Sequence, residues 1–297
     1  MTMDRAKIIA DLSERALLPW ATLNACLADH NRSETIFVNL LHRVQTGPEL
    51  DTDEERALFY GIHILAAQQT ETALTPLIEI LQNRREETDR ILGDEAIGET
   101  LPRLLMALGS GKGALYWDIA TGSAADWLIR DAFFKAWTYE VLSRRISRRT
   151  AQSRLQRLPK WMSAPADSPL WMSWMNVIAD LGMTGLLPEI DTALRSGRAE
   201  IGTLAISDRD YQDVRARAQA NTQHVRHKPE WRARNGFVPF GQASALKYDF
   251  YRAALVAPGT TEDVSRNLIS QAAEEAVTGF LRPSEAGNEN TPRRRPD

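Results

Sequence analysis

Apolar side chains recur at helical spacing from about Ile8 to about Arg217, and glycine, proline and capping residues interrupt the pattern at short intervals. Recurrence at i, i+3, i+4 and i+7 predicts a succession of amphipathic helices, each of which must bury one face against a neighbour. Sustained alternation of polar and apolar residues, which is typical of strands, is nearly absent. The pattern therefore predicts an all-α protein.

The apolar stripes also predict where the helices lie. Helical segments are expected over residues 8–17, 23–27, 36–44, 58–65, 73–81, 101–108, 115–120, 128–142, 170–181 and 186–194. Residues 83–88 are expected to form a charged connection. The segment 170–181 is apolar on nearly every side, which predicts a central position in the fold.

Several helix starts carry a capping signal. In a capping box, a side-chain oxygen accepts from the amide three residues on, and the acid at that position reaches back. Thr52 with Glu55 has this spacing, as does Ser207 with Asp210. The N-caps expected from such signals are Thr52, Asp126, Ser147 and Ser207.

The glycine-rich loop from Gly109 to Gly113 resembles a phosphate-binding loop only superficially. Met106 and Gly113 stand where a P-loop requires glycine and Ser or Thr, and a helix precedes the loop in place of a strand. We interpret the loop as a helix stop.

Short helices in close succession favour a HEAT-like α-α superhelix, a right-handed solenoid of helix pairs in which each pair buries its core against the next. We expect a helical-repeat domain over residues 1–228. An aromatic-rich arm and a C-terminal helix packed on that domain are expected over 229–281, and a disordered tail, rich in charge and proline, over 282–297.

Composition and charge narrow the function classes. The 297 residues are 43% hydrophobic and 25% charged, and the net charge of −3 argues against nucleic acid or an acidic membrane as the default partner. The single cysteine, Cys26, excludes an internal disulfide and is expected to be a buried structural thiol. The N-terminal residues lack the pattern of a signal peptide, and no run of about 18 apolar residues is present, so a cytoplasmic protein that does not enter the membrane is expected.

One segment, residues 141–160, is strongly basic and contains no acid. Its arginines are candidate contacts to a partner or an anion: Arg144, Arg145, Arg148, Arg149, Arg154 and Arg157. Arg148 and Arg149 fall in the first turn of an expected helix, where guanidinium groups and free amides together could hold an anion. The alternative is a solvated face that acidic neighbours balance.

Three tryptophans follow the basic segment and interleave with methionines. Trp161, Trp171 and Trp174 are candidates for an apolar ridge that binds a partner, because Trp and Met suit adaptable contact. Trp171 and Trp174 share one helical face, so packing in the core is the alternative.

Catalytic and metal sites have weaker signals. Asp94, Glu95 and Asp180 could line a groove and perform acid–base chemistry, although any helical protein carries such acids. His224 and His227 would share a helix face near Glu230, but this spacing is a poor zinc pattern, and a solvated helix end is the alternative. No cofactor and no bound zinc are expected.

Over residues 5–215 the chain resembles an uncharacterised bacterial family, domain of unknown function eleven-eighty-six. The resemblance rests on the order of short motifs: Gly93-Asp94, Leu101-Pro102, Trp127 to Ala132, Ile146 to Arg148, and Ile178 to Gly182. It implies an all-helical, HEAT-like superhelix without an established activity. Asp126 and Arg130 also resemble the aspartate and arginine of HEAT repeats, which implies that they brace the structure.

Some members of that family carry a C-terminal SEC-C zinc motif with the pattern RNxPCPCGSGKKYKxC. The segment from Arg234 to Gly241 resembles a degenerate copy of it, in which Val238 and Phe240 stand in place of cysteines. The resemblance implies that apolar packing replaces the metal here.

Together these features predict a non-enzymatic scaffold or adaptor that binds a macromolecular partner, an unidentified protein, through one face of the superhelix. A hydrolase-type enzyme with groove carboxylates is the first alternative. Binding of RNA or a phosphate ligand by the arginine-rich segment is the second, and the acidic overall charge argues against it.

Overall fold

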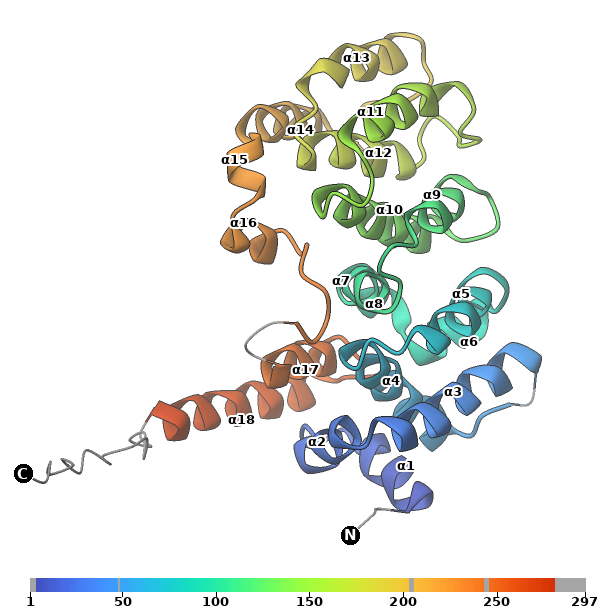
Figure 1. The fold of residues 1–297 in the computed structure, drawn as a ribbon, viewed down its shortest axis with the longest axis vertical. Helices are drawn as coiled ribbons and strands as arrows, with labels where there is room; N and C mark the ends of the chain where they lie inside the picture. Colours follow the sequence, from blue (N-terminus) through green and yellow to red (C-terminus); the bar gives the residue numbers. More distant parts are fainter. Residues whose placement is uncertain (1–3, 48, 203–205, 243–245, 281–297) are drawn as a thin grey trace, which may run out of the picture.

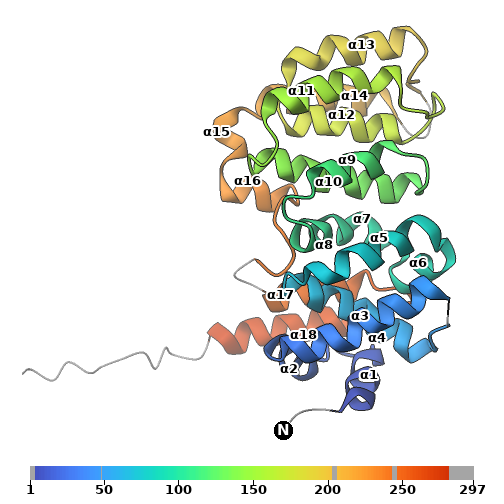
Figure 2. The same ribbon diagram turned by 45° about the vertical axis from the view of Figure 1, so that its right-hand side comes forward.

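The computed structural model describes residues 4–47, 49–202, 206–242 and 246–280. All regular elements in these ranges are helices and none is a strand, which confirms the all-α prediction. The helices lie in successive layers along the long axis of the molecule, with α1 and α2 at one end and α13 at the other (Figure 1). A view turned by 45° shows the same layering (Figure 2).

The first layers contain short helices that follow one another closely. Their bounds are α1 (Arg5–Ser13), α2 (Trp20–Ala28), α3 (His30–Thr46), α4 (Thr52–Ala67), the 3-10 turn η1 (Glu71–Ala73), α5 (Leu74–Asn83), α6 (Arg85–Ile91), α7 (Gly93–Glu99) and α8 (Leu101–Leu108). Residues 85–88, expected as a charged connection, belong to α6. Its own Glu86 and Glu87 favour the N-terminal end of that helix.

The later layers are α9 (Gly113–Thr121), α10 (Trp127–Leu142), α11 (Arg148–Arg157), the turn η2 (Leu158–Lys160), α12 (Leu170–Asp180), the turn η3 (Thr184–Leu186), α13 (Leu187–Arg195) and α14 (Asp208–Ala220). The chain then returns along the stack through α15 (Gln223–Arg226), α16 (Pro229–Arg234), α17 (Leu246–Leu255) and α18 (Glu262–Phe280). The tail expected over 282–297 lies outside the described residues.

Three helices form the centre of the stack. Helix α4 packs on α1, α3 and α8, whereas α10 packs on α8, α9 and α12, and α12 packs in turn on α14. Trp137 of α10 and Met175 of α12 are completely buried, because these helices are apolar over most of their circumference. The central position predicted for 170–181 is therefore confirmed.

The helix caps follow the sequence signals with one shift in register. Asp126, Ser147 and Ser207 cap α10, α11 and α14 as predicted. The predicted box of Thr52 and Glu55 is wrong by one residue: Asp51 is the N-cap of α4 and exchanges hydrogen bonds with Glu54. Aspartate ranks above threonine as an N-cap, but both are favoured there, and each of the two neighbours has an acid three residues on, so both registers fit a capping box.

Asp126 and Arg130 make structural contacts. Asp126 forms an ion pair of 2.8 Å with Arg85 of α6, and the buried Arg130 donates from Nε to the carbonyl oxygen of Ala120 at the end of α9. Both residues thus tie neighbouring helices together.

The aromatic-rich arm expected after residue 228 is largely helical, because α16 and α17 account for much of it. Its aromatic residues are largely buried, as expected: Phe240 packs edge-on against His63 of α4 and against Phe250. Gly241 has φ +79°, and a Cβ there would lie 2.7 Å from the Cα of Ala67, so only glycine allows the segment to approach α4 this closely. Tyr248 remains exposed.

Candidate functional site

The six arginines of the basic segment do not form one continuous surface. Arg145 pairs with the buried Glu140 at 2.9 Å, and Arg154 lies over the ring of Trp117. Arg149 and Arg157 are exposed. Only Arg144 and Arg148 line a common cavity.

Arginine side chains close the C-terminal ends of two central helices. At the end of α12, Arg148 donates to the carbonyl oxygens of Leu181 (2.6 Å) and Gly182 (2.8 Å), and Arg226 donates to Leu181 as well. At the end of α10, Arg232 donates to the carbonyl oxygen of Leu142 (2.7 Å). Helix C-termini carry partial negative charge and free carbonyls, so these contacts are favourable.

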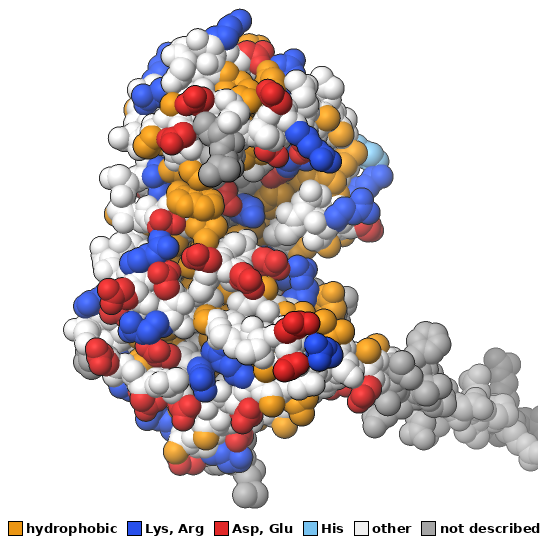
Figure 3. All heavy atoms as spheres, turned by 180° about the vertical axis from the view of Figure 1, so that it is seen from behind, with side chains coloured by type: hydrophobic (Ala, Val, Ile, Leu, Met, Phe, Trp, Pro, Cys, Tyr) orange, Lys and Arg blue, Asp and Glu red, His pale blue; other side chains and the backbone are white. Residues whose placement is uncertain are grey.

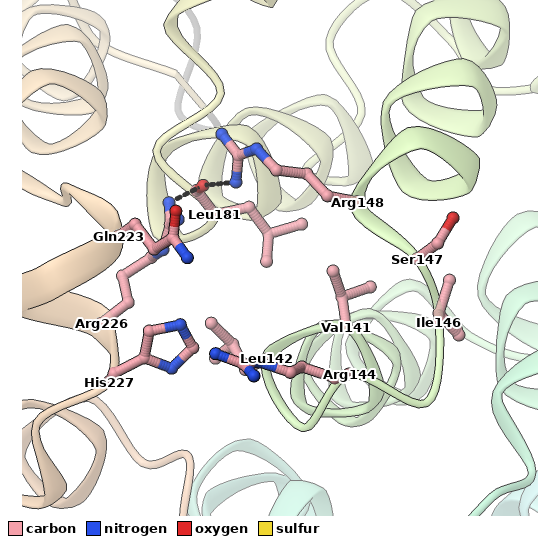
Figure 4. A pocket seen from close by; sticks show the side chains of 10 residues that line it. All are labelled: Val141, Leu142, Arg144, Ile146, Ser147, Arg148, Leu181, Gln223, Arg226 and His227. Atoms are coloured by element: carbon pink, nitrogen blue, oxygen red, sulfur yellow. Dashed lines mark hydrogen bonds between the residues drawn. The ribbon is translucent and has the colours of Figure 1, made fainter.

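A cavity of about 180 Å³ opens between these helix ends, and we call it the arginine pocket. Its charged or titratable lining residues are Arg144, Arg148, Arg226 and His227. Arg144 comes from the end of α10, Arg148 from the start of α11, and the other two from α15 and the residue after it. Figure 4 shows the guanidinium of Arg144 extending toward His227, while Arg148 and Arg226 meet at the Leu181 carbonyl.

The positive charge of the arginine pocket has no carboxylate partner among the described residues that line it. Burial and the nearby charge of Arg148 lower the pKa of Arg226 to about 10. Burial, with the charges of Arg144, Arg232 and Arg226, also lowers the pKa of His227. The cations therefore repel one another, and this repulsion favours an incoming anion.

Arg144 is held in a left-handed conformation, with φ +63°. It follows the end of α10 at the position where glycine is normally preferred, and a side chain there costs about 1 kcal/mol or more. Within the described residues its guanidinium makes no hydrogen bond and no ion pair, so no contact of the side chain accounts for arginine at this position.

The structure corrects the prediction for two of the tryptophans. Trp171 and Trp174 are completely buried, and their indole N–H groups donate to the carbonyls of Pro165 and Leu155. Neither can contact a partner, because α12 is central and the face they share points into the core. Trp161 is 59% exposed and remains available.

The predicted carboxylate groove is not assembled. Asp94 and Glu95 lie exposed on α7, where Asp94 is 3.9 Å from Arg85. Asp180 instead lines a separate cavity with Asp131, between α10, α12 and α14. The sequence could not show this because α7, which carries Asp94 and Glu95, and α12, which carries Asp180, lie in different layers of the stack.

The environments of His224, His227 and Cys26 do not suit a metal ion or a reactive thiol. His227 lines the arginine pocket among cations, which disfavour a metal ion, and His224 is exposed near it on α15. Across the described ranges, no group of three or more His, Cys, Asp or Glu residues could hold a metal ion. Cys26 is buried as predicted, and burial raises the pKa of its thiol to about 11.

The sequence pattern pointed to Arg144 and Arg148 in the basic segment and to His227 as a weak metal candidate, but not to Arg226 or Arg232. Those two residues lie in a short polar stretch without any distinguishing motif. Only the return of the chain across the ends of α10 and α12 brings them to the basic segment.

No protein-family model, curated protein or solved structure matches this chain. The resemblances to the uncharacterised bacterial family and to a SEC-C motif stay predictions. Among the helices that the structure describes, none combines the length and apolar character needed to cross a membrane.

Proposed function

We propose that this protein is a non-enzymatic recognition protein, and that the arginine pocket receives an anionic group displayed by a protein partner. The observation that carries the proposal is the positive charge of Arg144, Arg148 and Arg226 around one small cavity whose described lining residues include no carboxylate. We further propose that the stacked layers form a HEAT-like superhelix, which would present this pocket on its surface.

A purely structural role accounts for only part of the arginine pocket. Arg148, Arg226 and Arg232 tie helix ends together, and each has carbonyl partners that explain its presence. Arg144 has no such partner in the described part of the chain and occupies a conformation that arginine disfavours. A side chain in this conformation costs free energy, and such strain is often found at binding sites, which supports a binding role for Arg144.

The distribution of charge favours an acidic or phosphorylated protein segment over nucleic acid. Nucleic-acid binding depends on many phosphate contacts along an extended basic surface. Here Arg145 is paired with Glu140 and Arg154 lies on Trp117, so the cations do not form such a surface. Acidic and basic side chains are interspersed over the rear face of the molecule (Figure 3).

The test compares Arg144→Gly with Arg149→Gly in the full chain. Inorganic phosphate, a phosphoserine peptide, an unphosphorylated acidic peptide and a single-stranded RNA are each titrated calorimetrically into the two variants and the unmodified protein. We expect the phosphopeptide or the acidic peptide to bind, and Arg144→Gly to weaken that binding at least tenfold. The control Arg149→Gly removes an exposed arginine of the same segment and should bind normally.

Charge reversal at Arg148 would be a poor test, because this side chain also holds the end of α12. Equal binding by Arg144→Gly and the unmodified protein would overturn the proposal. Binding of RNA with higher affinity than either peptide would overturn it in favour of a nucleic-acid partner.

A further inference from the structure

A second cavity, of about 180 Å³, lies between α10, α12, α14 and the residue that follows α16. We call it the polar cavity. Helix α10 contributes Asp131, Lys135 and Thr138, and α12 contributes Ser173, Asn176 and Asp180. Arg217 of α14 and Asn235 complete its polar lining. It shares no lining residue with the arginine pocket.

The spacing of these residues is unusual for a seam between packed helices. On α10 the lining positions are 131, 134, 135 and 138, and on α12 they are 173, 176, 177 and 180. Both sets follow i, i+3, i+4 and i+7, the pattern of a helix face that meets a neighbour and is normally apolar. Here only Phe134 and Val177 are apolar, so two central helices place polar groups where apolar packing would stabilise them more.

Several polar groups of the cavity retain unused capacity for hydrogen bonding. The Ser173 side chain belongs to a residue that is 4% exposed, and its hydroxyl has no hydrogen-bond partner within the described ranges. Arg217 donates to Asp180, Asn176 and Asp213, which leaves one N–H on each terminal nitrogen. Lys135 is 3.7 Å from Asp131, a long separation that leaves both groups able to bind a ligand.

Asp180 is the carboxylate that would gain most from a ligand cation. Burial raises its pKa to about 6, and the charges of Arg217 and Lys135 do not offset this effect. Asp131 and Asp213 add to the increase because they are also negative. An ammonium group beside Asp180 would favour the ionised carboxylate and lower its pKa.

We propose that the polar cavity binds a free α-amino acid. Its ammonium group would lie between Asp131 and Asp180, and its carboxylate would face Lys135 and Arg217. Two acids and two cations balance each other, so they match a ligand that carries both charges and is neutral overall. A cavity of about 150 Å³ holds benzene, so about 180 Å³ has room for a small amino acid. This site goes beyond the proposed function and does not depend on it.

The experiment uses the full chain and the twenty proteinogenic amino acids, each at millimolar concentration, first in thermal unfolding and then in calorimetry. We expect at least one of them to raise the melting temperature and to bind with measurable heat. The corresponding amine without a carboxylate, and the corresponding acid without an amine, should each bind at least tenfold more weakly. Asp180→Asn should also weaken binding at least tenfold, because the amide cannot neutralise an ammonium group.

Asp213→Asn is the matched control, because Asp213 contacts the same Arg217 but is 60% exposed and does not line the cavity. It should bind like the unmodified protein, and so should Arg144→Gly, which separates this test from that of the arginine pocket. Affinity should be nearly constant between about pH 7 and 8, where the carboxylates and the ligand ammonium are ionised, and should fall toward tenfold per pH unit below about pH 6, since Asp180 must lose its proton.

Three results would overturn the proposal. The first is that none of the twenty amino acids binds. The second is that the amine alone binds as tightly as the amino acid, which would assign the cavity to a simple cation. The third is that Asp180→Asn binds the amino acid with unchanged affinity.

Discussion

The returning C-terminal segment packs on the stacked helices at two places: a lower crossing, where α17 meets α8, and an upper crossing, where α15 and α16 meet the ends of α12 and α10. The two crossings differ in whether a carboxylate neutralises the arginines. At the lower crossing, Arg103 of α8 forms two hydrogen bonds of 2.8 and 2.9 Å with Asp249 of α17, and donates from Nε to the carbonyl of Val238. At the upper crossing, Arg226 and Arg232 meet only carbonyl oxygens. The same residue type therefore closes both crossings, but only the lower one neutralises its charge.

This difference separates a structural contact from the proposed binding site. The cavity at the lower crossing is larger, about 300 Å³, yet Glu99 and Asp249 line it together with three arginines. The arginine pocket is smaller and has only cations and a histidine as titratable lining groups in the described structure. Residual charge, more than volume, identifies the surface where a partner of opposite sign would bind.

The largest effect on stability is expected from a substitution that removes the ion pair of the lower crossing. Asp249→Ala would leave the two terminal nitrogens of the largely buried Arg103 without their carboxylate, since the Asp249 and Arg103 side chains are only 6% and 14% exposed. We expect a loss of about 3–5 kcal/mol in the free energy of unfolding, measured by urea denaturation. The control is Glu99→Gln, which removes an exposed pair with Arg252 and should change stability by about 0–1 kcal/mol. A loss for Asp249→Ala no larger than that of the control would mean that the ion pair does not stabilise the crossing.

A smaller effect is expected from a substitution that adds a carboxylate to the upper crossing, as the lower crossing already has. Gln223 lines the arginine pocket at the start of α15, so Gln223→Glu would introduce the missing carboxylate. We expect a stabilisation of about 0.5–1 kcal/mol and a loss of anion binding, because the new charge competes with the ligand. Gln212→Glu on the exposed side of α14 is the control and should change neither property. If Gln223→Glu retained full anion affinity, the bound anion would have to lie elsewhere.

Two helix ends share the same left-handed backbone conformation. Gln69 follows α4 with φ +57° and Arg144 follows α10 with φ +63°, and both are left-handed. Arg144→Gly and Gln69→Gly should each raise the free energy of unfolding by up to about 1 kcal/mol, because glycine adopts this conformation freely. Only Arg144→Gly should weaken anion binding. Equal loss of binding in both variants would point to backbone flexibility and not to the guanidinium group.

The smallest effect concerns the titration of His227, which can be followed by NMR. Burial and the charges of Arg144, Arg232 and Arg226 lower its pKa in the free protein. The pKa should rise in Arg144→Gly and in Gln223→Glu, and it should rise in the unmodified protein when phosphate is added. A histidine held at a lowered pKa stabilises the fold least when it is protonated, so stability should increase slightly as the pH rises through this pKa. An unchanged titration on adding phosphate would show that phosphate does not enter the pocket.

Sequence alone determined the class of the fold and many of its details. Helical periodicity predicted an all-α chain, the capping residues placed the starts of α10, α11 and α14, and the apolar circumference of 170–181 predicted a central helix. These properties depend on residues within one or two turns of each other, so the local sequence contains the information. The one-residue error at Asp51 arose where two neighbouring residues both fit a capping box.

Tertiary structure alone decided which candidate residues share a site. For Trp171 and Trp174 the sequence left both core packing and a partner-binding ridge open, and the neighbours of α12 decide for the core. Arg148 and Arg226 meet at one carbonyl although η2, α12, η3, α13 and α14 separate them along the chain. Such contacts depend on how layers stack and where the chain returns. Because similar charges occur on nearly every helix, their local pattern cannot show which of them finds a partner and which stays unpaired.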